Sequence, residues 1–410
     1  MKKPGKYKLI VIAAAVAVAA LTASIIYYYS SQHSLALKGD PDVTVGLFGV
    51  YEDKGVMATL GGKDASDKVK TEGSVDTSKP GKYVIKYSLE GMSIERSVTV
   101  LDKMDPELTL KGEESMSLKL GEEFSDPGWE ARDREGNDIT ADVEVSDTDF
   151  RKAGTHYVTY TAKDSDGRAT RIKRKVDVEP NVDLDSPGLP ICMYHYVYDE
   201  ENPPEDLHRR YGNYISAQDL EEELNWLNEE GYYYPDWEEV RDYIDGKLIL
   251  PDKSIVLCFD DGAMSFLENG IPVLEKCKVP ATCFMITSSD GENKVANYKS
   301  DYVRYESHSH NMHRPGGSIG HGGIFTAISE EEGLADLKES IRICGSGRAF
   351  AYPYGDYNDR SRKMVESAGF LCAVTTQYGK AHPGDDPLLL PRVRMVMGQS
   401  LEKFISAVEP

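Results

Sequence analysis

The sequence has 410 residues, more than one hydrophobic core usually serves, so we expect two or more domains. Hydrophobic residues make up 40% and charged residues 28% of the chain, which excludes wholesale disorder and a protein with many membrane spans. The formal net charge of -22 argues against a nucleic-acid partner, because binding to a phosphate backbone requires clustered Lys and Arg.

The N-terminal segment has the pattern of a membrane anchor. An uncharged stretch, residues 9–29, follows four lysines: Lys2, Lys3, Lys6 and Lys8. A helix that crosses a bilayer needs about 20 mostly apolar residues, and lysines ahead of it predict a cytoplasmic N-terminus. We therefore expect residues 1–30 to be a cytoplasmic tail and a single-pass anchor, with the rest of the chain outside the cytoplasm. A cleaved signal peptide is the alternative, although its apolar core would be unusually long.

A repeated pattern follows this segment. YEDKGVMA, which begins at Tyr51, aligns with FSDPGWEA, which begins at Phe124, and both repeats end in alternating apolar residues, SVTV and KVDV. Short alternating strands separated by turn residues predict two all-β sandwiches, over residues 37–101 and 102–179. The second resembles the bacterial immunoglobulin-like domains of cell-surface proteins, and the first is a more divergent copy. We interpret both as spacers, with glycan binding as the alternative, and we interpret their Asp-rich turns as Asx turns rather than calcium sites.

The pattern changes after residues 180–189, which have the Pro, Gly and acidic composition of a linker. Helical patterns over residues 217–231 and 330–345 alternate with short apolar runs such as SIVLCF, ATCFMI and AFAYPYG. This alternation predicts an α/β domain with parallel strands over residues 190–410. In such domains the functional residues gather at the carboxyl ends of the strands.

Two groups of side chains in this domain indicate a metal site. Asp260 and Asp261 directly follow the run SIVLCF, and two adjacent carboxylates at a strand end call for a compensating cation. Further on, ESHSHNMHRP holds three of the nine histidines, His308, His310 and His313. Two imidazoles and one carboxylate around a divalent cation leave a position open for water, which is the catalytic arrangement. Taken separately, the aspartates would fit an ordinary turn and the histidines a solvated loop.

A third motif, the PYG of RAFAYPYGDYN, ends another apolar run. In this order, FDDG, the histidine cluster and PYG resemble the motifs of the polysaccharide deacetylases, the NodB-homology carbohydrate esterases. The resemblance covers residues 190–410, includes PICMYHY and LPRVRM, and is closest to the branch that deacetylates poly-N-acetylglucosamine. It implies a (β/α) barrel-like domain that hydrolyses N-acetyl groups on a bacterial cell-surface glycan polymer, either an N-acetylglucosamine-containing polysaccharide or peptidoglycan. It also implies a divalent metal ion, with zinc expected.

The resemblance assigns roles to residues of the first two motifs. Asp261 is expected to bind the metal, and Asp260 to act as the general base that takes a proton from water. The common family spacing His-x-x-x-His is absent here. The form His-Ser-His-x-x-His, in which the outer pair are ligands, therefore points to His308 and His313, with His310 as the alternative.

The third motif and its surroundings carry one departure from the family. The backbone N–H of Tyr354 is expected to stabilise the oxyanion of the tetrahedral intermediate. Ala349 stands where many relatives have an arginine. We therefore expect Arg392 or Arg394 to supply the charge that orients Asp260.

The general acid is the second departure, because the usual C-terminal Leu-x-His is missing. In the branch named above, a histidine near the start of the domain has this role, and His195 of MYHY stands at the matching position. His382, in a Pro- and Gly-rich loop, is the alternative. Two other functions stay open: a catalytically inactive glycan-binding or adhesive surface protein, and hydrolysis of a non-glycan amide or ester.

Overall fold

The computed structural model describes residues 18–22, 33–101, 105–133, 136–165 and 167–410. Within these ranges, no helix has the length and apolar composition to cross a membrane. The anchor expected over residues 1–30 lies outside the described residues except for 18–22, which are helical. The chain divides into two compact units, Met1–Lys111 with Gly128–Val145 and Tyr160–Ile172, and Gly112–Pro127 with Ser146–Thr159 and Lys173–Pro410. This division runs through the second sandwich.

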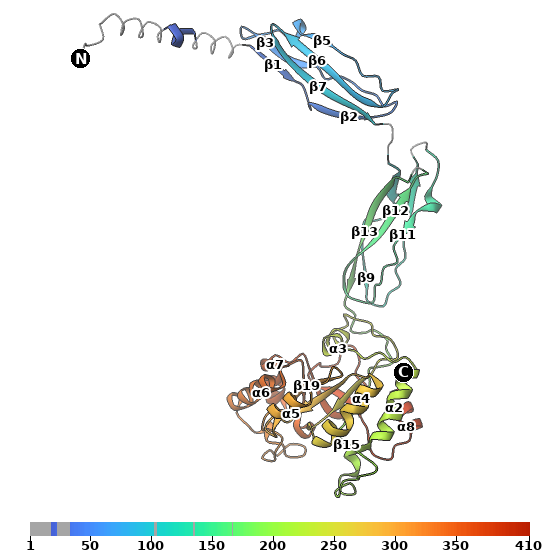
Figure 1. The fold of residues 1–410 in the computed structure, drawn as a ribbon, viewed down its shortest axis with the longest axis vertical. Helices are drawn as coiled ribbons and strands as arrows, with labels where there is room; N and C mark the ends of the chain where they lie inside the picture. The colour runs from blue at the N-terminus through green and yellow to red at the C-terminus, as the bar shows by residue number, and fades with distance from the viewer. Residues whose placement is uncertain (1–17, 23–32, 102–104, 134–135, 166) are drawn as a thin grey trace, which may run out of the picture. The chain divides into compact units, whose positions relative to one another are not determined.

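The first sandwich consists of two sheets, with strand orders β1-β3-β4 and β2-β7-β6-β5 (Figure 1). The strands are β1 (Ser34–Leu37), β2 (Asp42–Gly46), β3 (Val56–Leu60), β4 (Lys63–Asp64), β5 (Lys70–Glu72), β6 (Gly81–Leu89) and β7 (Met92–Leu101). The antiparallel strands β6 and β7 are joined by Glu90 and Gly91, both with positive φ, as a two-residue hairpin turn requires. The sandwich begins at β1, ahead of the expected start at residue 37.

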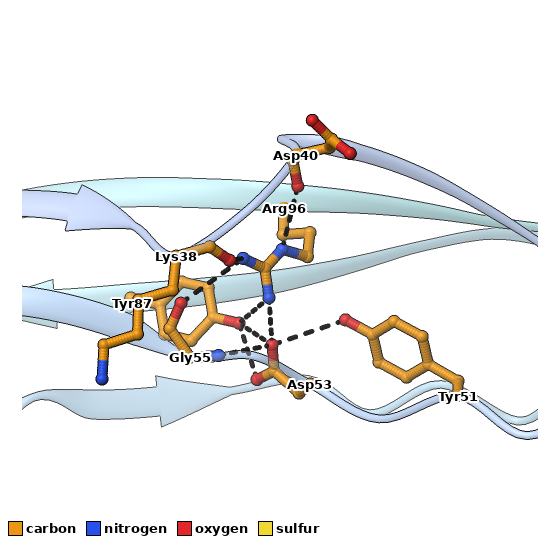
Figure 2. Close-up of polar contacts among 7 residues, drawn as sticks. All are labelled: Lys38, Asp40, Tyr51, Asp53, Gly55, Tyr87 and Arg96. Carbon is orange, nitrogen blue, oxygen red and sulfur yellow. Dashed lines mark hydrogen bonds and ion pairs between the residues drawn. The ribbon is translucent and has the colours of Figure 1, made fainter.

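A polar cluster around the buried Arg96 and Tyr87 lies in this first sandwich (Figure 2). Arg96 is only 2% exposed, and its guanidinium donates to the Asp53 carboxylate and to the carbonyl oxygen of Lys38. The Tyr87 hydroxyl also donates to Asp53, at 2.6 Å, and Asp53 accepts the backbone N–H of Gly55 at 3.1 Å. A buried guanidinium is tolerated only when it is paired in this way. The recurrence of Asp53 and Gly55 in the sequence repeat therefore has a structural explanation.

The second sandwich contains sheets of order β10-β8 and β11-β12-β13-β9. Its strands are β8 (Glu107–Leu110), β9 (Ser115–Lys119), β10 (Trp129–Arg132), β11 (Glu144–Val145), β12 (Gly154–Lys163) and β13 (Ala169–Glu179). Asp126, the counterpart of Asp53 in the repeat, pairs with the fully buried Arg174 at 3.5 Å. Each sandwich thus contains a buried arginine paired with an aspartate at the same position of the repeat.

The C-terminal domain is built on a closed barrel of parallel strands in the order β14-β17-β18-β19-β20-β21-β22. These strands are β14 (Ile191–Tyr194), β17 (Val256–Phe259), β18 (Ala281–Met285), β19 (Val303–Ser307), β20 (Ala349–Ala351), β21 (Cys372–Tyr378) and β22 (Leu390–Arg394). Every residue of β14, β17 and β18 is buried, as expected for strands covered on both faces. A short parallel pair, β15 (Tyr196–Tyr198) and β16 (Tyr214–Ser216), follows the first barrel strand. The barrel-like prediction is confirmed.

Helices surround the barrel strands (Figure 1). They are α2 (Ala217–Glu229), α3 (Trp237–Ile244), α4 (Ile271–Cys277), α5 (Gly291–Asn297), α6 (Glu330–Cys344), α7 (Asp359–Ala368) and α8 (Leu401–Val408). Helix α6 begins after Ser329, whose hydroxyl accepts the backbone N–H of Glu332, and ends at Gly345 with a φ of 73°. The helices predicted over 217–231 and 330–345 are therefore α2 and α6.

The barrel brings distant parts of the sequence to one rim, because parallel strands end on the same side. Asp260 follows β17, and His308 follows β19. His195 follows β14, the turn with Tyr354 follows β20, and Arg392 lies near the end of β22. The three motifs thus meet although many residues separate them along the chain.

Candidate active site

A cavity of about 380 Å³ opens at this rim. It is lined by most of the side chains expected from the sequence to act there: His195, Asp260, Asp261, His308, His313 and Tyr354. Arg394 also lines the cavity, whereas Arg392 is buried next to it and bonds to Asp260. The fold therefore brings together the residues that the sequence motifs single out.

Asp261, His308 and His313 form a group that could hold a metal ion. Their candidate ligand atoms all lie within 4.8 Å of one another, and Oδ1 of Asp261 is 3.6 Å from Nε2 of each histidine. Nδ1 of His308 donates to the carbonyl oxygen of Ala351 at 2.7 Å, which leaves the lone pair of Nε2 facing the group. Two imidazoles and a carboxylate are the donor set that zinc-like ions prefer. The residues therefore fit a divalent cation.

His310, the alternative ligand, lies outside this group. Its Nδ1 is hydrogen-bonded to the hydroxyl of Thr287 at 3.0 Å. The backbone N–H groups of His310 and Asn311 both donate to the carboxylate of Asp336, each at 2.7 Å. The outer pair of histidines is thus the one that faces Asp261.

Asp336 holds the loop that carries the two histidines, a role that sequence reasoning missed. It lies on α6, is 8% exposed, and accepts two backbone N–H groups between His308 and His313. Burial raises the pKa of Asp336, and the two backbone hydrogen bonds oppose this rise. Asp336 lies one helical turn from Gly333 and Ser340, on the buried stripe of α6, and an acidic residue on such a stripe is the signal that could have identified it.

Asp260 is held by Arg392 in a bidentate ion pair. Both contacts, from Nη1 to Oδ1 and from Nη2 to Oδ2, are 2.8 Å, and Nε of Arg392 donates to the carbonyl oxygen of Thr375 at 2.7 Å. Burial alone would raise the pKa of Asp260, but Arg392 reverses this and holds it well below its usual range. Arg394 instead donates to the side-chain oxygen of Asn213. Of the two arginines expected to orient Asp260, Arg392 makes the contact.

Two further side chains, also missed from the sequence, support Asp261. The hydroxyl of Tyr196 donates to Oδ2 of Asp261 at 2.8 Å and accepts from Arg210 at 2.9 Å. Burial and the neighbouring Asp261 raise the pKa of Tyr196, so its hydroxyl stays protonated. Nζ of Lys294, on α5, donates to the carbonyl oxygen of Gly262 at 2.9 Å. These contacts join residues far apart in sequence, so no local pattern announces them.

His195 lines the cavity, and one of its two ring nitrogens makes no hydrogen bond to a described residue. Its Nδ1 is buried and has no hydrogen-bond partner among the described residues. Burial lowers the pKa of His195, while the charges of Asp260 and Asp261 oppose this change. In the described part of the chain, His382 is not among the residues that line the cavity, and its ring packs against Gly188. The geometry thus favours His195 over His382 as the histidine that can meet a ligand.

Each of the three motifs contains one non-glycine residue in the left-handed backbone region. These are Asp261 (φ 74°), Ser309 (φ 69°) and Tyr354 (φ 60°). Such a conformation costs about 1–2 kcal/mol for a residue with a Cβ. The Tyr354 ring lies against the His313 ring, with 4.2 Å between centroids. Backbone strain is therefore concentrated where the motif side chains converge.

Two family models match the chain. Residues 35–100 and 108–178 both match the family described as bacterial surface protein, Ig-like domain. Residues 247–373 match the polysaccharide deacetylase family, and this segment contains all three motifs.

Curated relatives share the C-terminal half of the chain. A poly-beta-1,6-N-acetyl-D-glucosamine N-deacetylase of Staphylococcus aureus is 28% identical over 208 residues, which cover 47% of this chain and 70% of the relative. The enzyme of the same name from Staphylococcus epidermidis is 28% identical over 209 residues, covering 47% of this chain and 71% of the relative. Among solved structures, a Streptococcus pyogenes deacetylase in complex with acetate has a TM-score of 0.48 and 22% identity, and the match covers 55% of this chain and 100% of that one.

Proposed function

We propose that this chain, a member of the polysaccharide N-deacetylase family with two bacterial Ig-like domains ahead of its catalytic domain, removes N-acetyl groups from a bacterial polymer. The polymer contains N-acetylglucosamine and lies at the cell surface. The products are acetate and a polymer with free amines. The sequence relatives favour poly-N-acetylglucosamine over peptidoglycan, because both staphylococcal enzymes are named for that polymer.

One observation carries this proposal. The three candidate metal ligands and the Asp260–Arg392 ion pair share one cavity, with His195 and Tyr354 in its lining. Asp261, His308 and His313 would hold the divalent cation, with zinc as the ion we expect. Bound there, the cation would polarise the acetamide carbonyl and make water a better nucleophile.

The protein side chains would then handle the protons. Asp260 is ionised and fixed by Arg392, so it is ready to accept a proton from the attacking water. His195 would donate a proton to the departing amine. The backbone N–H of Tyr354 would donate to the oxygen that becomes negatively charged during the attack.

A catalytically inactive, glycan-binding surface protein is the alternative function. It would be favoured if the base or a ligand were replaced, but Asp260, Asp261, His308 and His313 are all present and adjacent. We also propose that residues 1–30 anchor the chain in the cell membrane with the catalytic domain outside, since Ig-like domains of this family occur in surface proteins.

The test is acetate release from N-acetylglucosamine oligomers, peptidoglycan and poly-N-acetylglucosamine, measured side by side. A chelator should abolish release, and added Zn²⁺ should restore it. Asp260→Asn should keep the metal, verified by elemental analysis, and lose about 10²–10⁴-fold in rate, as expected for removal of a general base. Full activity in protein shown to be free of metal would end the proposal.

A further inference from the structure

The two oxygens of the Asp261 carboxylate have different surroundings. Oδ1 faces Nε2 of His308 and of His313 at 3.6 Å. Oδ2 instead accepts the hydroxyl of Tyr196 at 2.8 Å. One oxygen is thus directed to the candidate metal site, and the other is already engaged by the protein.

The direction of the hydrogen bond between the Tyr196 hydroxyl and Oδ2 follows from the second partner of that hydroxyl, Arg210. Arg210 donates from Nη1 to the Tyr196 oxygen at 2.9 Å, and a guanidinium has no acceptor atom. The Tyr196 oxygen must therefore accept from Arg210, and its single proton must go to Asp261. The guanidinium also lies 5.4 Å from the centre of the Tyr196 ring, so the charge and the hydrogen bond hold the same side chain.

We propose that Tyr196, oriented by Arg210, is a positioning residue that reserves Oδ2 of Asp261, so that only Oδ1 can bind the metal. A free carboxylate can bind a cation through one oxygen or both. Occupying Oδ2 leaves the site with three protein ligand atoms and keeps further positions open for water and the acetamide oxygen. This inference rests on the proposed function, because it presupposes that the three ligands hold a cation.

The test replaces the hydroxyl and follows the metal directly. Wild-type protein and Tyr196→Phe are loaded with Co²⁺, whose visible absorption spectrum reports coordination number, and metal affinity is measured by competition with a chelator. In Tyr196→Phe we expect a weaker visible absorption and a changed metal affinity, because a second carboxylate oxygen joins the cation. We also expect a loss of about 10–100-fold in kcat, because that oxygen takes a position otherwise open to water or the acetamide oxygen. KM for a soluble oligomer should change little, since Tyr196 acts through Asp261.

A matched control is Tyr214→Phe. The Tyr214 ring lies 5.0 Å from the Tyr196 ring, and its hydroxyl donates to Asp206 rather than to Asp261. This variant removes one hydroxyl from the same aromatic cluster and should keep the wild-type Co²⁺ spectrum. Arg210→Gln keeps Tyr196 but removes the guanidinium that donates to its hydroxyl. This variant should shift the spectrum in the same direction as Tyr196→Phe. It serves as the test if Tyr196→Phe does not fold.

The outcomes separate the two proposals. A wild-type spectrum and affinity in Tyr196→Phe, or in Arg210→Gln if that variant must serve, would overturn the positioning role while leaving the metal site intact. An equal spectral change in Tyr214→Phe would overturn it too, because the effect would then come from the aromatic cluster as a whole. If the wild-type protein binds no Co²⁺, this result would instead contradict the proposed metal-dependent function.

Discussion

His195 is the residue whose role depends most on the cavity around it. It follows β14 directly, and its buried Nδ1 lacks a partner among the described residues, which a structural histidine would normally have. We predict that His195→Ala lowers kcat by about 10²–10⁴-fold, as expected for loss of a general acid, and removes the basic limb of the pH–rate profile. Metal content, measured by elemental analysis, should stay at the wild-type level.

His382→Ala is the matched control for this prediction. His382 lies outside the residues that line the cavity, and its backbone N–H donates to Asp385 within its own loop. The control should keep wild-type kcat. Near wild-type activity in His195→Ala together with failure of His382→Ala would assign the general acid to the loop histidine.

Glu223 is a second buried residue with a measurable consequence. It is 4% exposed and accepts the hydroxyl of Tyr194 at 2.7 Å. Burial raises the pKa of Glu223 from 4.5 to about 8. Between these values the unfolded chain has lost a proton that the folded chain keeps, so the folded state loses stability as pH rises through this window.

We therefore predict that Glu223→Gln becomes more stable relative to wild type as pH rises from 5 to about 8, by on the order of 4 kcal/mol at most. The measurement is thermal unfolding of both proteins at several pH values. A constant difference between wild type and Glu223→Gln across the window would contradict the raised pKa.

Residues of the site differ in how far the sequence predicts them. Asp260, Asp261 and the outer histidines belong to motifs in which several informative side chains stand close together. Lys294 stands alone in its segment, and Tyr196 is adjacent to His195 in PICMYHY, where nothing marks its hydroxyl as a partner of Asp261. Each acts by contacting the Asp261–Gly262 turn from a distant part of the chain. A single sequence does not reveal which side chain will reach across a barrel.

At the scale of elements, the loop between His308 and His313 is held by a neighbouring helix. Asp336 on α6 accepts two of its backbone N–H groups. We predict that Asp336→Ala weakens metal binding by about 10–100-fold, since it frees the segment that sets the spacing of the two histidines. A chelator competition titration measures this change.

Asp356→Ala is a matched control for the loop. The carboxylate of Asp356 is also buried and also accepts two backbone N–H groups, those of His321 and Gly323. His321 lines the same cavity, but this loop carries none of the three candidate metal ligands. Both variants leave two partly or fully buried backbone N–H groups without their carboxylate acceptor, which costs at most about 1–3 kcal/mol for each group. Both should therefore lose stability, but only Asp336→Ala should lose metal affinity. Equal metal affinities in the two variants would reject the special role of Asp336.

Elements were easier to predict than their supporting contacts. The fully buried strands β17 and β18 lie in the apolar runs SIVLCF and ATCFMI, and the helices α2 and α6 follow from helical patterns in the sequence. The short pair β15 and β16, which carries Tyr196, has no such periodicity. Its strands are three residues each, too short for alternation to be read.

At the scale of the whole molecule, we predict that a chain starting at Val182 folds and deacetylates soluble oligomers at the rate of the full chain. Its barrel closes on itself, with β14 paired to both β17 and β22, so no strand from a sandwich completes it. Activity on polymer in the cell wall should fall, because the shorter chain lacks the proposed anchor and both sandwiches. Acetate release from both substrates measures this difference.

A chain starting at Asp105, which keeps the second sandwich, is the control for this truncation. Within the second unit, the backbone of residues 151–153 bonds to that of residues 247–249. The shorter chain loses these contacts, and the control keeps them. An insoluble shorter chain beside an active control would show that the second sandwich belongs to the catalytic unit.

The left-handed backbone at Asp261, Ser309 and Tyr354 has a consequence for directed evolution. Glycine would relieve about 1–2 kcal/mol of strain at each position, against about 0.5–1 kcal/mol lost to the greater freedom of the unfolded chain. A library selected only for heat resistance should therefore accumulate glycine at these three positions, whereas one selected for acetate release should retain Asp261, whose carboxylate is a candidate metal ligand. At Asp261, selection for heat tolerance and selection for turnover would thus favour different residues.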